Sequence, residues 1–247
     1  MLRNALFHFG RFIKWLPNIF SKPENFRMYW NEMIRQMDHI GIGSFLIVFL
    51  ISIFIGAVTA VQFSYQLGGL TIPRYYIGYV VRDMTIIEMA PTITSLVLAG
   101  KVGSNIAAEI GGMQQKEHVA AMEIMGVNTS SFLVMPRLLA CVIMVPVLVC
   151  LSAVFNMLGA YLGAVLPGLF TGAEYVRGLR SFFEPHHVTM MLVKSVVFGI
   201  VICLVSCYQG YFVKQGSVEL GKSSTQAVVM SNILILISDY LIAVLLT

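Results

Sequence analysis

Long apolar stretches separated by short polar segments dominate this chain. No Asp, Glu, Lys or Arg occurs between His39 and Arg74, and none occurs between Leu138 and Ala173. Because about 20 apolar residues cross the ~30 Å hydrocarbon core as a helix, such stretches predict membrane spans. The pattern predicts an all-α integral membrane protein with about five spans. We expect these spans at residues 42–61, 84–108, within 138–173, at 188–213 and at 224–246.

Residues 1–40 have a different, amphipathic pattern. Apolar residues recur at helical spacing from Leu2 to Phe20, with basic residues between them, and Pro17 is expected to end this first helix. A second amphipathic stretch runs from Phe26 to Met37. We therefore predict interfacial helices over residues 1–40, followed by a five-span domain over residues 41–247. A pair of ordinary cytosolic helices is the alternative.

The composition agrees with a membrane protein. Hydrophobic residues make up 57% of the 247 residues and charged residues 11%, about half the charged fraction of a soluble domain. One membrane bundle fits this length, but an additional large soluble domain does not. The net charge of +4 requires no nucleic acid partner. The four cysteines form no CxxC pair, so no metal site is predicted, and no secretory signal is expected.

Lysine and arginine are distributed unequally between the two sides of the five predicted spans. Eleven lie on the side of the N-terminus and four on the other side. Because cytoplasmic segments carry the excess of these residues, the N-terminus is predicted to be cytoplasmic and the C-terminus to lie on the far side.

The segment Gly216–Ser223 fits the phosphate-binding pattern GxxxxGK[ST]. That motif binds phosphate only between a buried strand and a helix of an α/β sheet. Here it lies between two predicted spans, and the chain has no length to spare for a sheet. We expect a short, basic cytoplasmic turn that does not bind nucleotide.

The loop between the second and third spans is expected to hold a short cytoplasmic helix over about residues 114–125. Gly126 is a natural stop for this helix, and Asn128 is a natural cap for the next one. Such a helix either docks onto a cytosolic partner or simply connects two spans.

The same loop resembles the permease family of MCE-type ABC transporters, the MlaE/YrbE group. The resemblance rests on Gly100–Ser104, Ala108–Gly111, Glu117–Asn128 and Pro136-Arg137, and it extends in order over nearly the whole chain. Three positions depart from the usual motif: Lys101 stands in place of Arg, His118 in place of Gln, and Ile87 in place of an Arg that commonly precedes the Glu, which removes a charge near the expected lipid site.

The resemblance implies a homodimer in a bacterial inner membrane that moves phospholipid or a related lipid between the inner and outer membranes. It further implies cytosolic ATPase subunits that bind ATP and Mg, and a periplasmic ring of MCE-domain proteins. This chain itself is expected to be a permease without a catalytic site or a bound cofactor. The residues expected to couple it to the ATPase are Glu117, His118, Met122, Glu123, Met125 and Gly126.

Three ionisable residues, Glu88, Lys194 and Asp239, lie within the predicted spans, at similar depths in the outer half of the membrane. Glu88 and Lys194 are predicted to meet a lipid headgroup, and Asp239 is predicted to be structural. In the alternative, Lys194 only pairs with the two acidic residues. Tyr65, Leu67 and Leu70 are predicted to contact acyl chains. A transporter or channel driven by an ion gradient through these charges is the second functional hypothesis.

Overall fold

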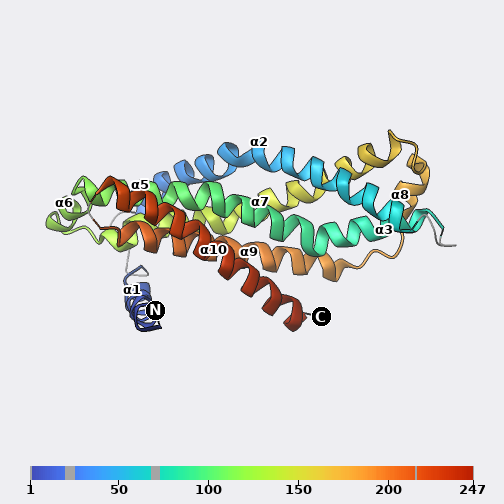
Figure 1. The fold of residues 1–247 in the computed structure, drawn as a ribbon. Helices are drawn as coiled ribbons and strands as arrows, with labels where there is room; N and C mark the ends of the chain where they lie inside the picture. Colours follow the sequence, from blue (N-terminus) through green and yellow to red (C-terminus); the bar gives the residue numbers. More distant parts are fainter. Residues whose placement is uncertain (1, 20–25, 68–72, 215, 247) are drawn as a thin grey trace. The chain divides into compact units, whose positions relative to one another are not determined.

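The computed structural model of the chain describes residues 2–19, 26–67, 73–214 and 216–246. Every regular element in these ranges is helical. Five helical segments are long and apolar enough to cross a membrane, which confirms the predicted all-α membrane fold. They are Arg27–Gln66, Tyr75–Gln115, Thr129–Val165, Pro185–Tyr211 and Ser217–Leu246. Figure 1 shows the order of the helices along the chain.

The N-terminal part differs from the prediction at one point. Helix α1 (Leu2–Ile19) contains Pro17, so the expectation that Pro17 ends it is wrong. The proline removes one backbone hydrogen bond near the helix end, but Trp15 and Ile19 on either side of it are buried and hold this turn against the protein. Helix α2 (Phe26–Leu67) is continuous, so the second amphipathic stretch and the first span form one helix.

The later helices are longer than the apolar stretches that predicted them. Helix α7 (Thr129–Val165) begins nine residues before Leu138 and ends two residues before Pro167. Helices α9 (Pro185–Tyr211) and α10 (Ser217–Leu246) also begin outside the apolar stretches. Polar residues at helix ends extend the helices into the headgroup region, where hydropathy gives no signal.

The chain divides into two compact units. The first comprises Met1–Ile40, Leu98–Met144 and Gly199–Ile235, and the second comprises Gly41–Val97, Val145–Phe198 and Leu236–Thr247. The long helices α2, α7, α9 and α10 each contribute to both. Each unit has its own buried residues, so we describe them separately.

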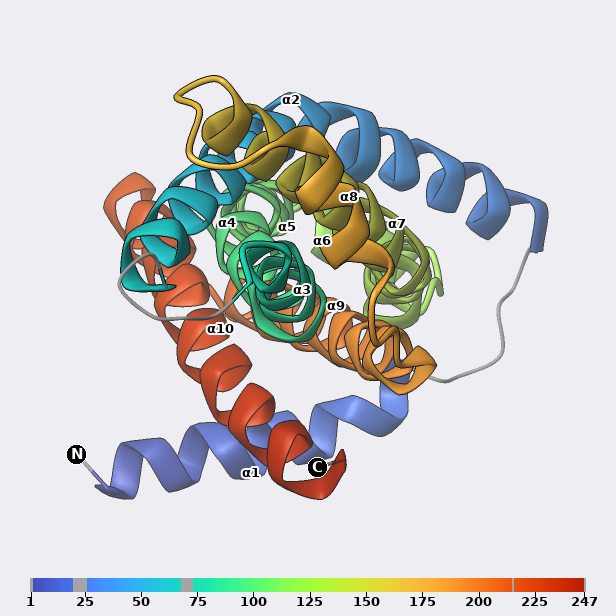
Figure 2. The same ribbon diagram turned by 90° about the vertical axis from the view of Figure 1, so that its right-hand side faces the viewer.

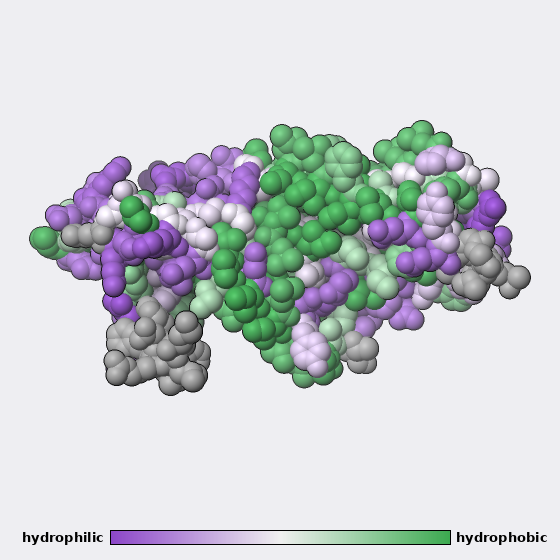
Figure 3. All heavy atoms as spheres, viewed as in Figure 1, coloured by the Kyte–Doolittle hydropathy of each residue, from purple (hydrophilic) through white to green (hydrophobic). Residues whose placement is uncertain are grey.

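In the second unit, α2 and α7 approach each other closely through small residues. A Cβ atom added at Gly163 would lie 2.6 Å from the Cα of Ala57, and one added at Gly56 or Gly159 would overlap the opposite backbone. Ser52 and Thr94 also donate hydrogen bonds to the hydroxyl of Ser152, at 2.8 and 2.7 Å. Small residues and hydroxyl pairs hold helices together in lipid, where the hydrophobic effect does not. Figure 3 shows hydrophobic side chains gathered over α2 and the last part of α10.

Helices α3 (Tyr75–Met84) and α8 (Gly172–Arg180) of the second unit lie side by side (Figure 2). A capping box begins α8: Glu174 accepts hydrogen bonds from Thr171, and these lower the pKa of the Glu174 carboxyl group. The buried Arg82 donates to the carbonyl oxygens of Leu179, Ser181 and Phe182 at 2.7–2.9 Å, which satisfies the end of α8.

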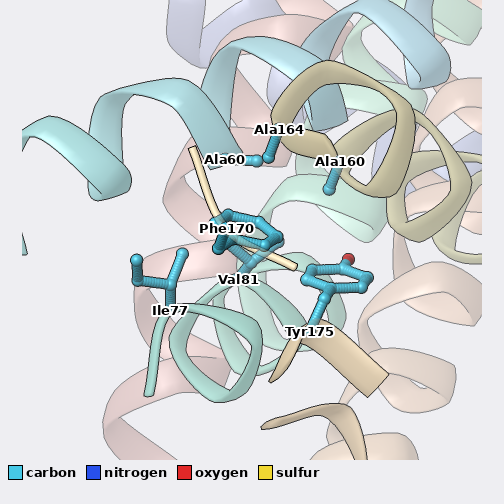
Figure 4. Packing of buried hydrophobic residues seen from close by; sticks show 7 residues of the cluster. All are labelled: Ala60, Ile77, Val81, Ala160, Ala164, Phe170 and Tyr175. Carbon is cyan, nitrogen blue, oxygen red and sulfur yellow. The ribbon is translucent and has the colours of Figure 1, made fainter. Parts of the chain in front are cut away.

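An apolar cluster lies beneath these two helices (Figure 4). Phe170 stacks on Tyr175, with ring centroids 5.6 Å apart, and the Tyr175 hydroxyl donates to the carbonyl of Met157 in α7. The other buried members are Ala60, Ile77, Val81, Ala160 and Ala164. The cluster fixes α3 and α8 against α2 and α7.

The first unit contains α1, α5 (Ser104–Gln115) and α6 (His118–Ile124), together with the adjoining parts of α2, α7, α9 and α10. Figure 1 shows α6 as a short helix between the end of α5 and the start of α7. Trp15 of α1 packs among the rings of Tyr208, Tyr211 and Phe212 near the end of α9. Its indole nitrogen donates to Ser130 at the start of α7.

Candidate functional site

The second span is not a uniform α-helix. It contains the π-helical segments η1 (Thr85–Ile93) and η2 (Ala99–Gly103) on either side of α4 (Thr94–Leu98). Pro91 lies in η1 and has no backbone N–H, so it cannot bond to the carbonyl of Ile87 four residues earlier. A widened turn relieves the clash of the proline ring with that carbonyl and leaves the Ile87 oxygen able to accept another donor.

Lys194 of α9 is the donor that bonds to the Ile87 carbonyl. Its Nζ donates to the Ile87 carbonyl at 3.1 Å and to Oε2 of Glu88 at 2.9 Å, and it lies 2.6 Å from Oδ1 of Asp239. An ammonium group has three protons, and here three acceptor oxygens surround it. Thr92 in turn donates to Oδ2 of Asp239 at 3.2 Å. The three predicted intramembrane charges therefore form one cluster, which joins η1, α9 and α10.

The members of the cluster differ in exposure. The Lys194 side chain is fully enclosed and that of Asp239 is 10% exposed, whereas that of Glu88 is 44% exposed. Two carboxylates share one ammonium group, so with all three ionised the cluster carries one excess negative charge. Within this chain, Glu88 is the member that can reach another molecule, and Lys194 and Asp239 hold it in place.

The other predicted lipid contacts are described only in part. Tyr65 is 75% exposed near the end of α2. The side chain of Leu67 and the whole of Leu70 lie outside the described residues. Their contact with acyl chains stays a prediction.

Sequence reasoning missed two members of the cluster, the Ile87 carbonyl and Thr92. The signal for the first was present, because a proline four residues after Ile87 leaves that carbonyl without its helical donor. Thr92 carried no comparable signal, since a threonine within a span commonly bonds to its own helix.

The predicted cytoplasmic helix over residues 114–125 is shorter than expected. Helix α5 continues to Gln115, the chain turns at Glu117 with a φ of 59°, and α6 covers only His118–Ile124. A residue in the left-handed backbone conformation cannot continue a right-handed helix, so the prediction of one helix over residues 114–125 is wrong.

The predicted stop and cap at the other end of α6 are confirmed. Gly126 has a φ of 83°, and the N–H groups of Gly126 and Val127 donate to the carbonyls of Glu123 and Met122 in a Schellman motif. Asn128 then caps α7 by accepting from the N–H of Ser131.

The predicted coupling residues do not share one orientation. Glu117, His118 and Met125 are exposed, and Met122 is partly exposed. Ile124, which the sequence did not single out, is 88% exposed, and Met125 is 71% exposed. Glu123 is exposed as well, but its carboxylate also accepts from Thr129 Oγ1 at 3.0 Å and from the Tyr211 hydroxyl at 3.2 Å.

An ion-pair network ties the helices next to α6 together. The Arg137 side chain of α7 is 2% exposed and lies 3.0 Å from Oε2 of Glu109 in α5. The other oxygen of Glu109 lies 3.3 Å from Arg35 of α2. Arg137 also donates to the Leu133 carbonyl at 2.6 Å. One carboxylate therefore joins three helices of the first unit.

The segment with the phosphate-binding pattern is helical. Apart from Gly216, it forms the first turns of α10, so the expectation of a short turn is wrong. Lys222 pairs with Glu219 at 2.8 Å, and Ser223 donates to the Gln209 carbonyl. The described part of the chain contains no strand, so the segment lacks the sheet that a phosphate-binding loop requires. The same part has no group of three or more His, Cys, Asp or Glu residues that could hold a metal ion.

Comparison with known proteins agrees with a membrane transporter. Residues 33–245 match the family described as "Permease MlaE". A "Probable ABC transporter permease protein" of Rickettsia bellii is 37% identical over 215 residues, which cover 87% of this chain and 83% of that protein. A protein of the same description from Synechocystis is 33% identical over 88% of this chain and 82% of its own length.

A more distant relative comes from a plant. The "Protein TRIGALACTOSYLDIACYLGLYCEROL 1, chloroplastic" of Arabidopsis thaliana is 30% identical over 88% of this chain and 62% of its own length. The family match extends from within the first candidate span to within the last, and the bacterial relatives are described as probable ABC transporter permeases. The chain is therefore a multi-pass membrane protein that belongs to the MlaE permease family.

Proposed function

We propose that this chain is the membrane-spanning subunit of an ATP-driven transporter that moves phospholipid between the inner and outer membranes of a bacterium. The observation that carries this proposal is the family match, together with relatives described as ABC transporter permeases. The name of the plant relative contains a galactolipid, which supports a lipid as the cargo.

The lipid site is proposed at the Glu88 cluster. Glu88 is the exposed member, and the enclosed Lys194 fixes its position within the membrane. Because the cluster has one carboxylate in excess, it favours a headgroup that carries an amine. Tyr65, Leu67 and Leu70 are proposed to contact the acyl chains.

The ATPase subunit is proposed to bind at α6. The exposed apolar side chains of Ile124 and Met125 suit burial in a groove of a cytosolic partner, and Glu117, His118, Met122 and Gly126 surround them. Glu123 supports the helix through its hydrogen bonds to Thr129 and Tyr211. ATP and Mg are proposed to bind to that partner and not to this chain.

The assembly and orientation are proposed from exposure and charge. In the most apolar stretch of α10, only 17% is buried within the chain, against 33–56% in the corresponding stretches of the other four spans. The exposed face of α10 is therefore proposed to pack against a second copy in a homodimer.

The N-terminus is proposed to be cytoplasmic, and a periplasmic MCE-domain ring is proposed at the other side. A cysteine placed at the exposed Lys116 should react only from the cytoplasm, and labelling from the periplasm would contradict this orientation.

Reconstitution tests the proposed cargo and energy source together. The complex purified with its ATPase partner is placed in liposomes that contain fluorescent phosphatidylethanolamine, and transfer to acceptor vesicles is followed with and without ATP. A photoreactive residue at position 88 should crosslink to the lipid, whereas one at position 222, about 25 Å from Asp239 along α10, should not. Transport that follows a pH gradient and ignores ATP would instead support the ion-gradient hypothesis.

A further inference from the structure

Helix α6 is held weakly by its own packing. Of its seven residues only Val119 is buried. Both of its ends adjoin a residue with positive φ, Glu117 at 59° and Gly126 at 83°. A short helix between two such breaks has no rigid continuation into α5 or α7, so contacts made by its side chains must set its orientation.

One polar contact of α6 reaches two other helices. The Glu123 carboxylate accepts from Thr129 at the start of α7 and from Tyr211 at the end of α9, and the two hydroxyl oxygens lie 3.0 Å apart. Two hydroxyl groups have only two protons to share among these three contacts. An ionised carboxylate attracts both protons, since hydrogen bonds to a charged acceptor are the stronger ones.

Helix α1 contacts the residues next to Glu123 in α7 and α9. The hydroxyl of Tyr211 donates to Glu123, and its ring packs against Trp15, with ring centroids 5.7 Å apart. Trp15 is 5% exposed, and its indole nitrogen donates to Ser130 at 3.1 Å, next to Thr129 in the chain. Arg11, one turn earlier, lies 3.8 Å from the centroid of the Phe212 ring. Trp15 therefore contacts both helices that bind Glu123.

We propose that Trp15 and Tyr211 are positioning residues for α6, and that α1 thereby controls the orientation of the helix that binds the ATPase. Trp15 contacts Tyr211 and Ser130, and Tyr211 and the adjacent Thr129 donate hydrogen bonds to Glu123. The role in ATPase binding rests on the proposed function, but the control of α6 by α1 does not. Displacement of α1 frees Tyr211 and Thr129 to move, and α6 then loses the contact that orients it.

Hydrogen–deuterium exchange of the full-length chain in nanodiscs tests the positioning directly. Tyr211→Phe removes the hydroxyl and keeps the ring, and Trp15→Leu removes the ring and the indole N–H. Exchange of the amides at 118–127 should rise about tenfold in each, which corresponds to about 1.4 kcal/mol for a lost hydrogen bond to a charged group. Tyr161→Phe and Phe54→Leu are matched controls, because these side chains are 37% and 68% exposed and belong to the second unit. Amides at 199–207 report whether a variant unfolds as a whole.

A second measurement on the same variants separates this inference from the proposed function. ATPase association and lipid transfer by the complex should fall with Trp15→Leu and Tyr211→Phe but not with the controls. Faster exchange at α6 with unchanged ATPase association would uphold the positioning and contradict ATPase binding through α6. Unchanged exchange at 118–127 in both variants would overturn the inference.

Discussion

Replacement of Lys194 by methionine tests whether the intramembrane charge cluster holds the helices together. Methionine keeps most of the side-chain volume but removes the charge that faces Glu88 and Asp239. At an effective dielectric constant of about 20, contacts of 2.9 and 2.6 Å are each worth about 6 kcal/mol of Coulomb energy before desolvation is subtracted. Removal of one partner from a buried ion pair typically costs about 3–5 kcal/mol, because the remaining charge stays buried without compensation.

The matched control is Lys222→Met. Lys222 pairs with Glu219 at a similar distance of 2.8 Å, but its side chain is 62% exposed. Solvent-exposed ion pairs contribute about 0–1 kcal/mol. We therefore expect Lys194→Met to lower the free energy of unfolding by about 3–5 kcal/mol and Lys222→Met by less than about 1 kcal/mol, measured by denaturant titration of the protein in mixed micelles.

A compensated variant identifies the cause. Lys194→Met combined with Glu88→Gln and Asp239→Asn removes all three charges together, and it should recover most of the lost stability because no uncompensated charge remains. Equal stability of Lys194→Met and Lys222→Met would refute the interpretation. Failure of the triple variant to recover would show that the hydrogen bonds of Lys194, such as that to the Ile87 carbonyl, and not its charge, are what stabilise the protein.

Three further changes test other parts of the structure. Gly163→Ala should cost about 1–3 kcal/mol of stability through the clash with Ala57, whereas Gly221→Ala, with open space around it, should not destabilise; equal thermal midpoints would contradict the close crossing of α2 and α7. Gly126→Ala should cost about 1–2 kcal/mol, because its φ of 83° disfavours a Cβ, and should raise exchange at the end of α6; an unchanged exchange rate would argue against the Schellman motif. Lys222→Ala should leave ATP binding by the assembled complex unchanged, and loss of photo-affinity labelling by an ATP analogue would show that the phosphate-binding pattern is functional.

The sequence by itself determined the class of the protein and the number of its spans. Long apolar stretches without charged residues, such as 40–73 and 138–173, are unfavourable in water, so composition and hydropathy suffice for that conclusion. The helix stop at Gly126 and the helix cap at Asn128 were also predictable from the sequence, since left-handed backbone geometry and helix capping depend on a few neighbouring residues. The family followed from motifs spread in order along the chain, and the match over residues 33–245 confirms it.

The tertiary structure decided which residues meet. Glu88, Lys194 and Asp239 lie on three different helices, and their common depth could not show that Lys194 is enclosed while Glu88 remains exposed. The π-helical segment η1 also escaped the sequence; it contains Pro91, and its Ile87 carbonyl accepts from Lys194 of another helix. The hydrogen bond between Glu123 and Tyr211 likewise joins residues 88 positions apart in the sequence. Contacts between distant segments arise from packing, and no local pattern of residues encodes them.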